Sequence, residues 1–380
     1  MAYNSKEVNT LKACVVSVTI VLAVLGTILF TAYGQMLGPI SHDHAAWSSF
    51  GSLLSGFFAV ASTTATVATL IFLVYQNNQL QRASEHQQLV TEAQLEAMRF
   101  EQYINHRRLF MDRLSELQAN FENKFIFVDG ESLYNKVFPS NGPTNLKFKT
   151  APECSRDSEN WLGAVGAQLS TLDEFLGQAQ WEIRKTRELI SILIGICGDI
   201  SIRWMAEDND GDILFLGKNT GINIYSLEEF ISMTKSIYNA LLLYAGNDKF
   251  TGLSKGVMRY PQDALIEYFI HSFEDCEAVK AVKTIPGLSL MERLYFDLDK
   301  LRADNFDWLL NDSYSILLGT FRDKESVAKL RDAAVFDEFI SCSVRECAEA
   351  STKVVEGSVN HSLLMRCKEN ILCLISRNRP

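Results

Sequence analysis

The chain has 380 residues, with 36 Lys and Arg against 46 Asp and Glu, for a formal net charge of -10. This acidic balance excludes a general electrostatic attraction to nucleic acid, which requires a basic surface. The eight cysteines are scattered without a CxxC pair, so neither a zinc site nor a disulfide framework is indicated, and reduced thiols are the default.

Two apolar segments without charged residues lie near the N-terminus, at residues 13–33 and 47–75. Each is long enough as a helix to cross a hydrocarbon core of roughly 30 Å, which takes about 20 residues. A cleavable signal peptide is the alternative for the first segment, because Lys6 and Lys12 precede it. A signal's apolar core spans only about 7 to 15 residues, however. We therefore expect residues 1–78 to form a two-helix transmembrane hairpin.

Basic residues flank this pair of segments on one side only. Lys6 and Lys12 precede the first segment, and the loop at residues 34–46 contains neither Lys nor Arg. Four arginines follow the second segment: Arg82, Arg99, Arg107 and Arg108. By the positive-inside rule, the sequence predicts a two-pass protein with both termini in the cytoplasm.

Small, weakly polar residues recur at intervals of three and four in the second segment, which places them on one face of a helix. This hydroxyl stripe consists of Ser52, Ser55, Ala59, Ser62, Thr66 and Thr69. One interpretation is a packing seam, where small residues let helices approach and hydroxyls bond across the seam or to their own carbonyls. The other is an assembly of several copies whose hydroxyls line a wet path through the membrane lipid. Under either interpretation we expect a homo-oligomer.

The second helix is expected to continue as a polar stalk over residues 79–125, because residues 76–101 lack Gly and Pro and are rich in Gln, Glu, Ala and Leu. A thin apolar stripe there approximates a heptad seam: Leu80, Ala83, Val90, Ala97 and Ile104. Gln87, Gln94 and Glu101 interrupt it. A firmer apolar face follows at Phe110 and Leu114 and must be buried.

Residues 126–380 are expected to form a mostly α-helical cytosolic domain, because apolar residues recur there with a helical period. The predicted helices cover 161–198, 226–245, 262–283, 288–310, 327–354 and 362–375. Alternating strand patterns are scarce, and only residues 212–217 and 222–225 predict a small hairpin. The predicted fold class is therefore mainly α.

The second segment also carries a resemblance. Trp47-Ser-Ser-Phe50-Gly51, a second glycine at Gly56 and the span end Tyr75-Gln-Asn-Asn-Gln resemble the phage abortive infection family, over roughly residues 47–125. Farther on, residues 106–110 and 133–139 are similar to the two-span membrane effectors encoded beside bacterial retrons. One departure is Ser52, where that family commonly has an acidic residue, so no role of that acid is transferred here.

This resemblance implies a toxic effector of an anti-phage system in the bacterial inner membrane. In such systems a retron reverse transcriptase and its RNA-linked DNA hold the effector inactive, and phage attack releases it to damage the membrane. Two competing classes remain. One is a membrane-anchored binding or scaffold protein without pore activity, and the other is an enzyme whose site is assembled by the folded domain.

Motifs for catalysis are missing: there is no GxSxG, no HExxH and no Gly-rich phosphate loop. We therefore expect no enzyme activity, no cofactor and no metal. The acidic run at residues 207–212 fails as a calcium loop, because Gly217 stands where a bidentate Glu is needed, and it is predicted to be a solvated turn.

Two basic sets are candidates for contact with a partner's nucleic acid. They are Lys147, Phe148 and Lys149, in which a base could stack on the aromatic ring, and Arg184, Lys185 and Arg187. A solvated surface without a ligand is the alternative for both sets.

Overall fold

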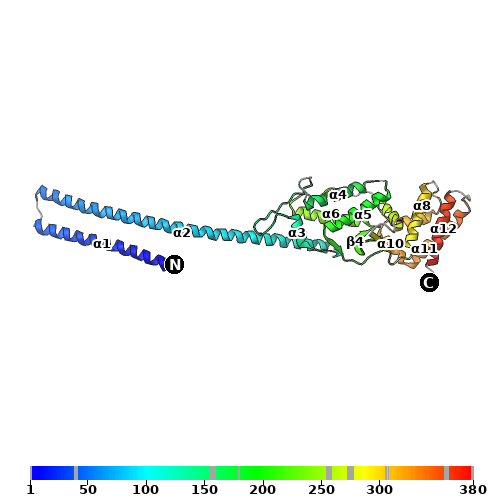
Figure 1. The fold of residues 1–380 in the computed structure, drawn as a ribbon, viewed down its shortest axis with the longest axis horizontal. Coiled ribbons are helices and arrows are strands. Elements are labelled where there is room, and N and C mark those ends of the chain that lie inside the picture. The colour runs from blue at the N-terminus through cyan, green and yellow to red at the C-terminus, as the bar shows by residue number, and fades with distance from the viewer. Residues whose placement is uncertain are drawn as a thin grey trace. The chain divides into compact units, whose positions relative to one another are not determined.

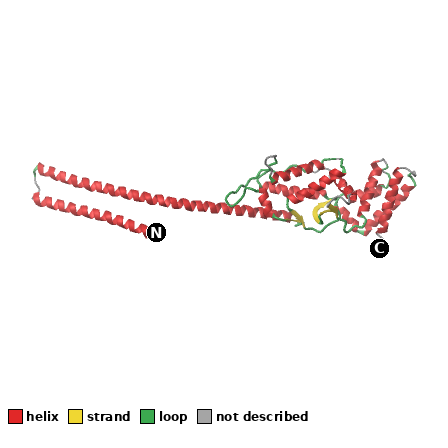
Figure 2. Ribbon diagram, viewed as in Figure 1, coloured by secondary structure: helices red, strands yellow, loops and turns green. Residues whose placement is uncertain are grey.

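The computed structural model describes residues 2–37, 42–154, 160–178, 180–253, 259–271, 278–303, 306, 308–354 and 359–377. The chain divides into two compact units, Met1–Ala97 and Met98–Pro380. Twelve α-helices and five short strands account for most of the described residues, as Figures 1 and 2 show. The predicted fold class, mainly α, is confirmed.

The N-terminal unit contains α1 (Ala2–Leu37) and the first part of α2 (His44–Asn120). These two helices are long and apolar enough to cross a membrane. Only 6% of the apolar window of α1 and none of that of α2 is buried inside the protein, unlike the core helix of a soluble domain. Helix α1 is longer at both ends than the predicted span. Helix α2 contains both the second span and nearly all of the predicted stalk.

The two helices of this unit run antiparallel (Figure 1). They contact each other through aromatic side chains. The Phe30 ring lies 6.0 Å from that of Phe57, and the Tyr33 ring lies 5.1 Å from that of Phe50. Gly26 allows this approach, because a Cβ atom there would stand 2.7 Å from the Phe57 ring. The Tyr33 hydroxyl donates a hydrogen bond to the Ala46 carbonyl oxygen, 3.0 Å away. A close aromatic contact therefore joins α1 to α2.

The last turns of α2 belong to the C-terminal unit. Phe110, Leu114 and Leu117 are buried in its core, as their spacing predicts. The helix ends at Asn120, five residues before the predicted end, because Glu122 and Asn123 adopt positive φ angles of 58° and 56°. Strand β1 (Phe125–Phe127) follows and pairs antiparallel with β2 (Ile202–Trp204).

Helices make up most of the rest of the C-terminal unit. They are α3 (Gly130–Val137), α4 (Trp161–Leu176), α5 (Ile183–Asp199), α6 (Leu227–Tyr244), α7 (Arg259–His271), α8 (Leu288–Ala303), α9 (Asn311–Thr320), α10 (Lys324–Ala328), the 3₁₀ turn η1 (Lys329–Arg331), α11 (Ala333–Ser351) and α12 (Val359–Arg377). Helix α8 packs against α7, α9 and α12.

Four predicted helices differ from the structure. The stretch 161–198 forms two helices that are separated after Gly177. The stretch 262–283 is helical only to His271; residues 272–277 lie outside the described residues, and 278–280 form strand β5 (Ala278–Lys280). The stretch 327–354 is divided by η1. The stretch 288–310 is helical to Ala303 in α8, and residues 308–310 form a turn. The apolar recurrence predicted helical content correctly and did not mark where each helix ends.

The predicted hairpin is present as β3 (Asp212–Phe215) and β4 (Lys218–Asn223). Its two-residue turn has positive φ angles at Leu216 (50°) and Gly217 (75°), the geometry that suits the twist of a hairpin. The second strand begins four residues earlier than predicted. Strand β5 pairs on the other side of β3, giving the strand order β4-β3-β5.

We expect Gly221→Ala to lower the stability of the C-terminal unit by about 1 to 3 kcal/mol. Gly221 has a φ of +76°, and an added Cβ atom would stand 2.5 Å from the Trp204 ring. The matched control is Gly195→Ala in α5, where nothing lies within 4 Å and Ala should stabilise the helix by about 0.5 to 1 kcal/mol. Thermal unfolding of the detergent-solubilised full chain measures both. Equal midpoints for the two variants would contradict this prediction.

Candidate functional site

The hydroxyl stripe lies on α2, away from α1. All six of its members are exposed in the N-terminal unit. The half-buried positions of α2 that face α1 form another set: Phe50, Leu54, Phe57, Ala61, Thr64 and Ala68. At about 100° per residue, the centres of the two sets are about 150° apart around the helix. The contact between α1 and α2 therefore leaves the stripe open.

Threonine hydroxyls in the stripe are bonded within their own helix. Thr66 Oγ1 donates to the Ser62 carbonyl oxygen at 2.9 Å, and Thr69 Oγ1 donates to that of Ala65 at 2.9 Å. Such bonds satisfy the hydroxyl proton in an apolar environment and leave the oxygen as an acceptor. The stripe is thus a continuous, weakly polar face that no other part of its unit covers.

The first basic set lies in the loop after α3. Phe148 is 61% exposed, yet its ring lies edge-on to the buried His106, with 5.3 Å between centroids. The backbone of Lys147 is held by Asn141, whose Oδ1 accepts from the Lys147 N–H at 2.8 Å. Burial lowers the pKa of His106. The loop is therefore ordered by the aromatic cluster around His106, with one face of Phe148 accessible.

The second basic set lies in the first turns of α5, a different element. Arg184 is exposed and pairs with Glu188 at 3.5 Å, while Lys185 is half-buried and Arg187 is exposed. Three basic residues near a helix N-terminus add to its positive partial charge, which favours an anion nearby. The structure places the two basic sets on separate elements of the C-terminal unit.

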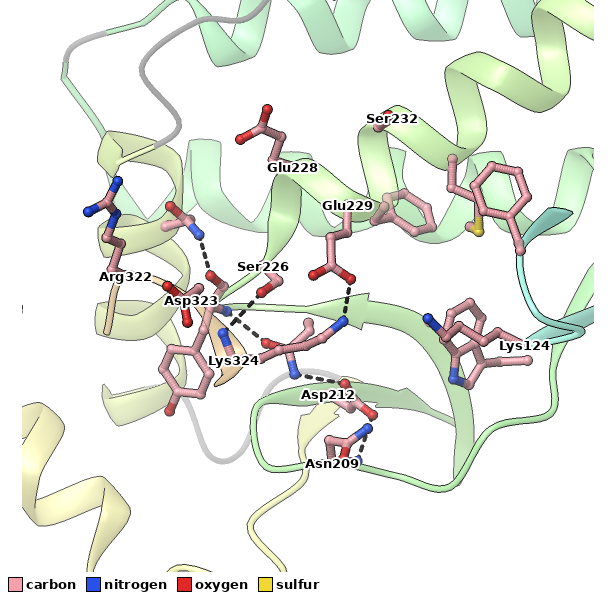
Figure 3. A pocket seen from close by; sticks show the side chains of 18 residues that line it. Lys124, Asn209, Asp212, Ser226, Glu228, Glu229, Ser232, Arg322, Asp323 and Lys324 are labelled. Carbon is pink, nitrogen blue, oxygen red and sulfur yellow. Dashed lines mark hydrogen bonds and ion pairs between the residues drawn. The ribbon is translucent and has the colours of Figure 1, made fainter. Parts of the chain in front are cut away.

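A cavity of about 510 Å³ opens in the C-terminal unit where several elements meet (Figure 3). Lys124 comes from the segment after α2, Asn209 and Asp212 from the β3–β4 hairpin region, Glu229 from α6 and Lys324 from α10. Figure 3 shows Lys324 reaching across the opening to Glu229, with which it forms an ion pair. Sequence motifs did not identify this cavity, because its lining is drawn from segments that are far apart in the chain.

The carboxylate of Asp212 in this cavity is fully engaged by neighbouring donors. It accepts from the Asn209 N–H at 2.8 Å, from Asn219 Nδ2 at 2.9 Å and from Asn223 Nδ2 at 2.8 Å. Three donors occupy most of the acceptor sites of a carboxylate, which leaves it little capacity to bind a further ligand. Asp212 therefore shapes the hairpin rather than performing chemistry.

Asp210, two residues earlier, joins three separate segments. It is 3% exposed and accepts from the backbone N–H groups of Lys283 (2.7 Å) and Thr284 (3.0 Å), and from Arg331 in η1 (3.2 Å). Burial alone would raise its pKa, but the bonds from Thr284, Lys283 and Arg331 outweigh it, and the pKa is lowered. The prediction of a solvated turn at residues 207–212 is wrong for two of its carboxylates. Asp210 is buried against donors remote in sequence, and Asp212 is buried within the hairpin region.

A second buried group links the hairpin region to α8. Glu292 is completely buried, pairs with Lys280 of β5 and accepts a hydrogen bond of 2.5 Å from the Tyr225 hydroxyl. Burial and the adjacent Glu292 charge raise the pKa of Tyr225 well above its usual value. No sequence signal identifies this cluster, because each residue stands alone in its own amphipathic segment.

Another cavity, of about 700 Å³, lies between α5, α7 and α8. Asp263 lines it, 3.5 Å from Arg259 and 3.3 Å from the Tyr295 hydroxyl, which donates to it. Burial raises the pKa of Asp263 to about 6, although Arg259 and Tyr295 act in the opposite direction. In the described part of the chain, no group of three or more His, Cys, Asp or Glu is placed to hold a metal ion.

We expect the pH dependence of stability to change when Asp263 is replaced by Asn. The folded-state pKa of Asp263 is raised from 3.8 to about 6. The contribution of this carboxyl to the free energy of unfolding is therefore complete below about pH 4 and is lost as the pH rises through 6. Wild type should lose up to about 3 kcal/mol over this window, and Asp263→Asn should not. Chemical unfolding of the detergent-solubilised full chain at pH 4 and pH 7 measures the difference.

Asp210→Asn is the control of opposite sign. The pKa of Asp210 is lowered, so its contribution is present above the unfolded value of 3.8 and is lost as the pH falls. That variant should therefore be destabilised at pH 7 and resemble wild type more closely at pH 3. Identical pH profiles for the two Asp→Asn variants would show that neither carboxyl is perturbed as described.

Comparisons of the chain with models of protein families, with curated proteins and with solved structures found no match.

Proposed function

We propose that this chain is a two-pass effector of an anti-phage system of the abortive infection or retron type. A partner complex holds it inactive, and after release it damages or depolarises the bacterial inner membrane. The proposal is supported by the resemblance over residues 47–125 and by two helices whose apolar windows are long enough to span a bilayer and are almost entirely unburied.

In this proposal residues 1–78 form the transmembrane hairpin, residues 79–125 the stalk and residues 126–380 the cytosolic domain. Both termini are cytoplasmic, because Lys and Arg flank the two spans but are missing from the loop between them. The aromatic contact between Phe30 and Phe57 supports a hairpin that inserts as one unit.

The open hydroxyl stripe is the observation that carries the proposal. Helix α1 occupies the opposite side of α2, so each copy presents a complete hairpin with one unused, weakly polar face. Hydroxyl groups that face lipid gain no favourable polar interaction from it. Several copies that turn this face inward would instead enclose a polar path. Ser52, Ser55, Ser62, Thr66 and Thr69 would line it.

The C-terminal unit is assigned to partner binding rather than to catalysis. Two of its acidic residues at the 510 Å³ cavity are already engaged, Asp212 by three donors and Glu229 by Lys324. The retron reverse transcriptase and its RNA-linked DNA are the partners that the resemblance implies. The sets at residues 147–149 and 184–187 are the proposed contacts for that nucleic acid.

We expect Ser62→Leu combined with Thr66→Leu to abolish depolarisation without preventing insertion, because Leu removes both hydroxyls and keeps the span apolar. Single-cell membrane potential after triggering, read with a voltage-sensitive dye, measures the effect. The matched control is Thr19→Leu with Thr27→Leu in α1. These hydroxyls are also exposed and bonded to their own helix, at 2.8 and 2.7 Å, but lie outside the stripe. Full toxicity of the Ser62/Thr66 variant would remove the pore interpretation.

The same assay separates the competing classes. If growth stops while the potential holds steady, the hairpin is an anchor, and residues from Arg99 onward on an unrelated anchor should retain full activity. Among enzymatic hypotheses, Asp263 is the carboxyl with a raised pKa inside a cavity. If the Asp263→Asn variant is expressed normally but has lost its activity and no longer depolarises the membrane, an enzyme would be favoured.

A further inference from the structure

One stretch of α2 is exposed along its whole length. Every residue from Gln76 to Ala97 is exposed, although the helix continues through this stretch without a break. An isolated helix in water is marginally stable, and a helix without a packing partner derives little stability from its side chains. Packing of this stretch against a second copy would therefore stabilise it.

The exposed apolar positions of this stretch are in heptad register with the hydroxyl stripe. Seven residues after Thr69 stands Gln76, and seven residues further stands Ala83. Two steps of seven residues also lead from Thr66 to Leu80. All five positions are exposed. The stripe and the stalk positions therefore form one set, with alternating spacings of three and four, from Ser52 to Ala97. This spacing repeats every 3.5 residues on average, the period of a left-handed coiled coil.

Charges are arranged so that this face can meet an identical copy of itself. The charged residues between Gln76 and Ala97 are Arg82, Glu85, Glu92 and Glu96. At about 100° per residue, all four lie at least about 130° around the helix from the centre of the shared face. In a parallel pair of identical helices each residue meets its own copy, so a charge on this face would face a like charge. The shared face carries none.

Its polar residues are also suited to pairing with themselves. Gln76, Gln87 and Gln94 each carry an amide donor and an amide acceptor, so two copies of the same Gln can bond to each other. A polar residue within a seam fixes register and lowers stability. With Leu80 and Val90 as its larger apolar members in the stalk, this seam favours reversible association of copies that are already confined to one membrane.

We propose that α2 carries one continuous self-association seam from Ser52 to Ala97, and that its occupant is the same seam of a second copy in parallel orientation. The orientation follows from insertion, because every copy enters the bilayer by the same helix and at the same depth. Helix α1 does not obstruct the seam, since it contacts the side of α2 about 150° from the hydroxyl stripe. This inference rests on the proposed function only for the shared membrane and requires neither toxicity nor a trigger.

Cysteine crosslinking in membranes of untriggered cells tests the seam. The full-length chain is used with Cys14, Cys154 and Cys373, the exposed thiols among the described residues, replaced by Ser. Single cysteines are placed in the seam (Ala83→Cys, Val90→Cys) and on the far side (Glu85→Cys, Glu92→Cys), and a mild oxidant is added. We expect a crosslinked dimer band from the seam variants and no dimer band from the far-side variants. The reason is that only a parallel, in-register pair brings identical seam residues together.

A matched pair of neighbouring substitutions provides the second measurement. Val90→Glu places like charges opposite each other in the seam and should abolish the Ala83→Cys crosslink. Leu89→Glu adds the same charge to an adjacent residue that is more exposed, at 67% against 37%, and should leave the crosslink unchanged. Equal crosslinking at positions 83, 85, 90 and 92, or no crosslinking at any of them, would overturn the seam.

The two proposals fail separately. Seam crosslinks without depolarisation on triggering would leave the seam in place and overturn the effector function. If depolarisation depends on Ser62 and Thr66 but the crosslinks show no seven-residue period, the effector function stands and the seam is overturned. Crosslinks centred on Phe50 and Phe57 instead would show that α1 is exchanged between copies.

Discussion

The constraint on which the rest of this structure depends is the continuity of α2. In hydrocarbon, each backbone N–H and C=O must be bonded within its own segment, and an unbroken helix satisfies this requirement. Helix α2 keeps its bonds from His44 to Asn120 without an interruption. Because a continuous helix rotates its side chains by a fixed angle per residue, every position on it is assigned to a face, and the faces can have separate roles.

Two of those faces differ in chemistry. The side that contacts α1 is aromatic and apolar, and Gly26 lets the Phe57 ring approach the α1 backbone closely. The opposite side carries hydroxyls, small residues and glutamines. These residues gain little interaction energy from contact with lipid or with a bulky partner. This division lets one helix contact α1 and still leave its opposite face uncovered in its own unit. It also keeps the charges of residues 76–97 away from that face.

The C-terminal unit is held together by polar groups as well as by its apolar core. Asp210 receives donors from the segment after β5 and from Arg331, and Glu292 connects Lys280 to Tyr225. Buried charges of this kind are tolerated because their partners are arranged in advance, and the removal of one partner leaves the other without compensation. These carboxylates therefore connect segments of the C-terminal unit that are distant in the chain.

The sequence alone determined the mainly α fold class, the two apolar segments and the buried face at Phe110 and Leu114, because hydrophobic period and segment length are local properties. It also predicted the β3–β4 hairpin, whose turn depends on Gly217. Only the tertiary structure decided that the hydroxyl stripe is the open side of α2 and that Asp210 and Asp212 are buried rather than solvated. The reason is physical: which face of a helix is covered, and which donors reach a carboxylate, depends on segments distant in the chain that local patterns do not encode.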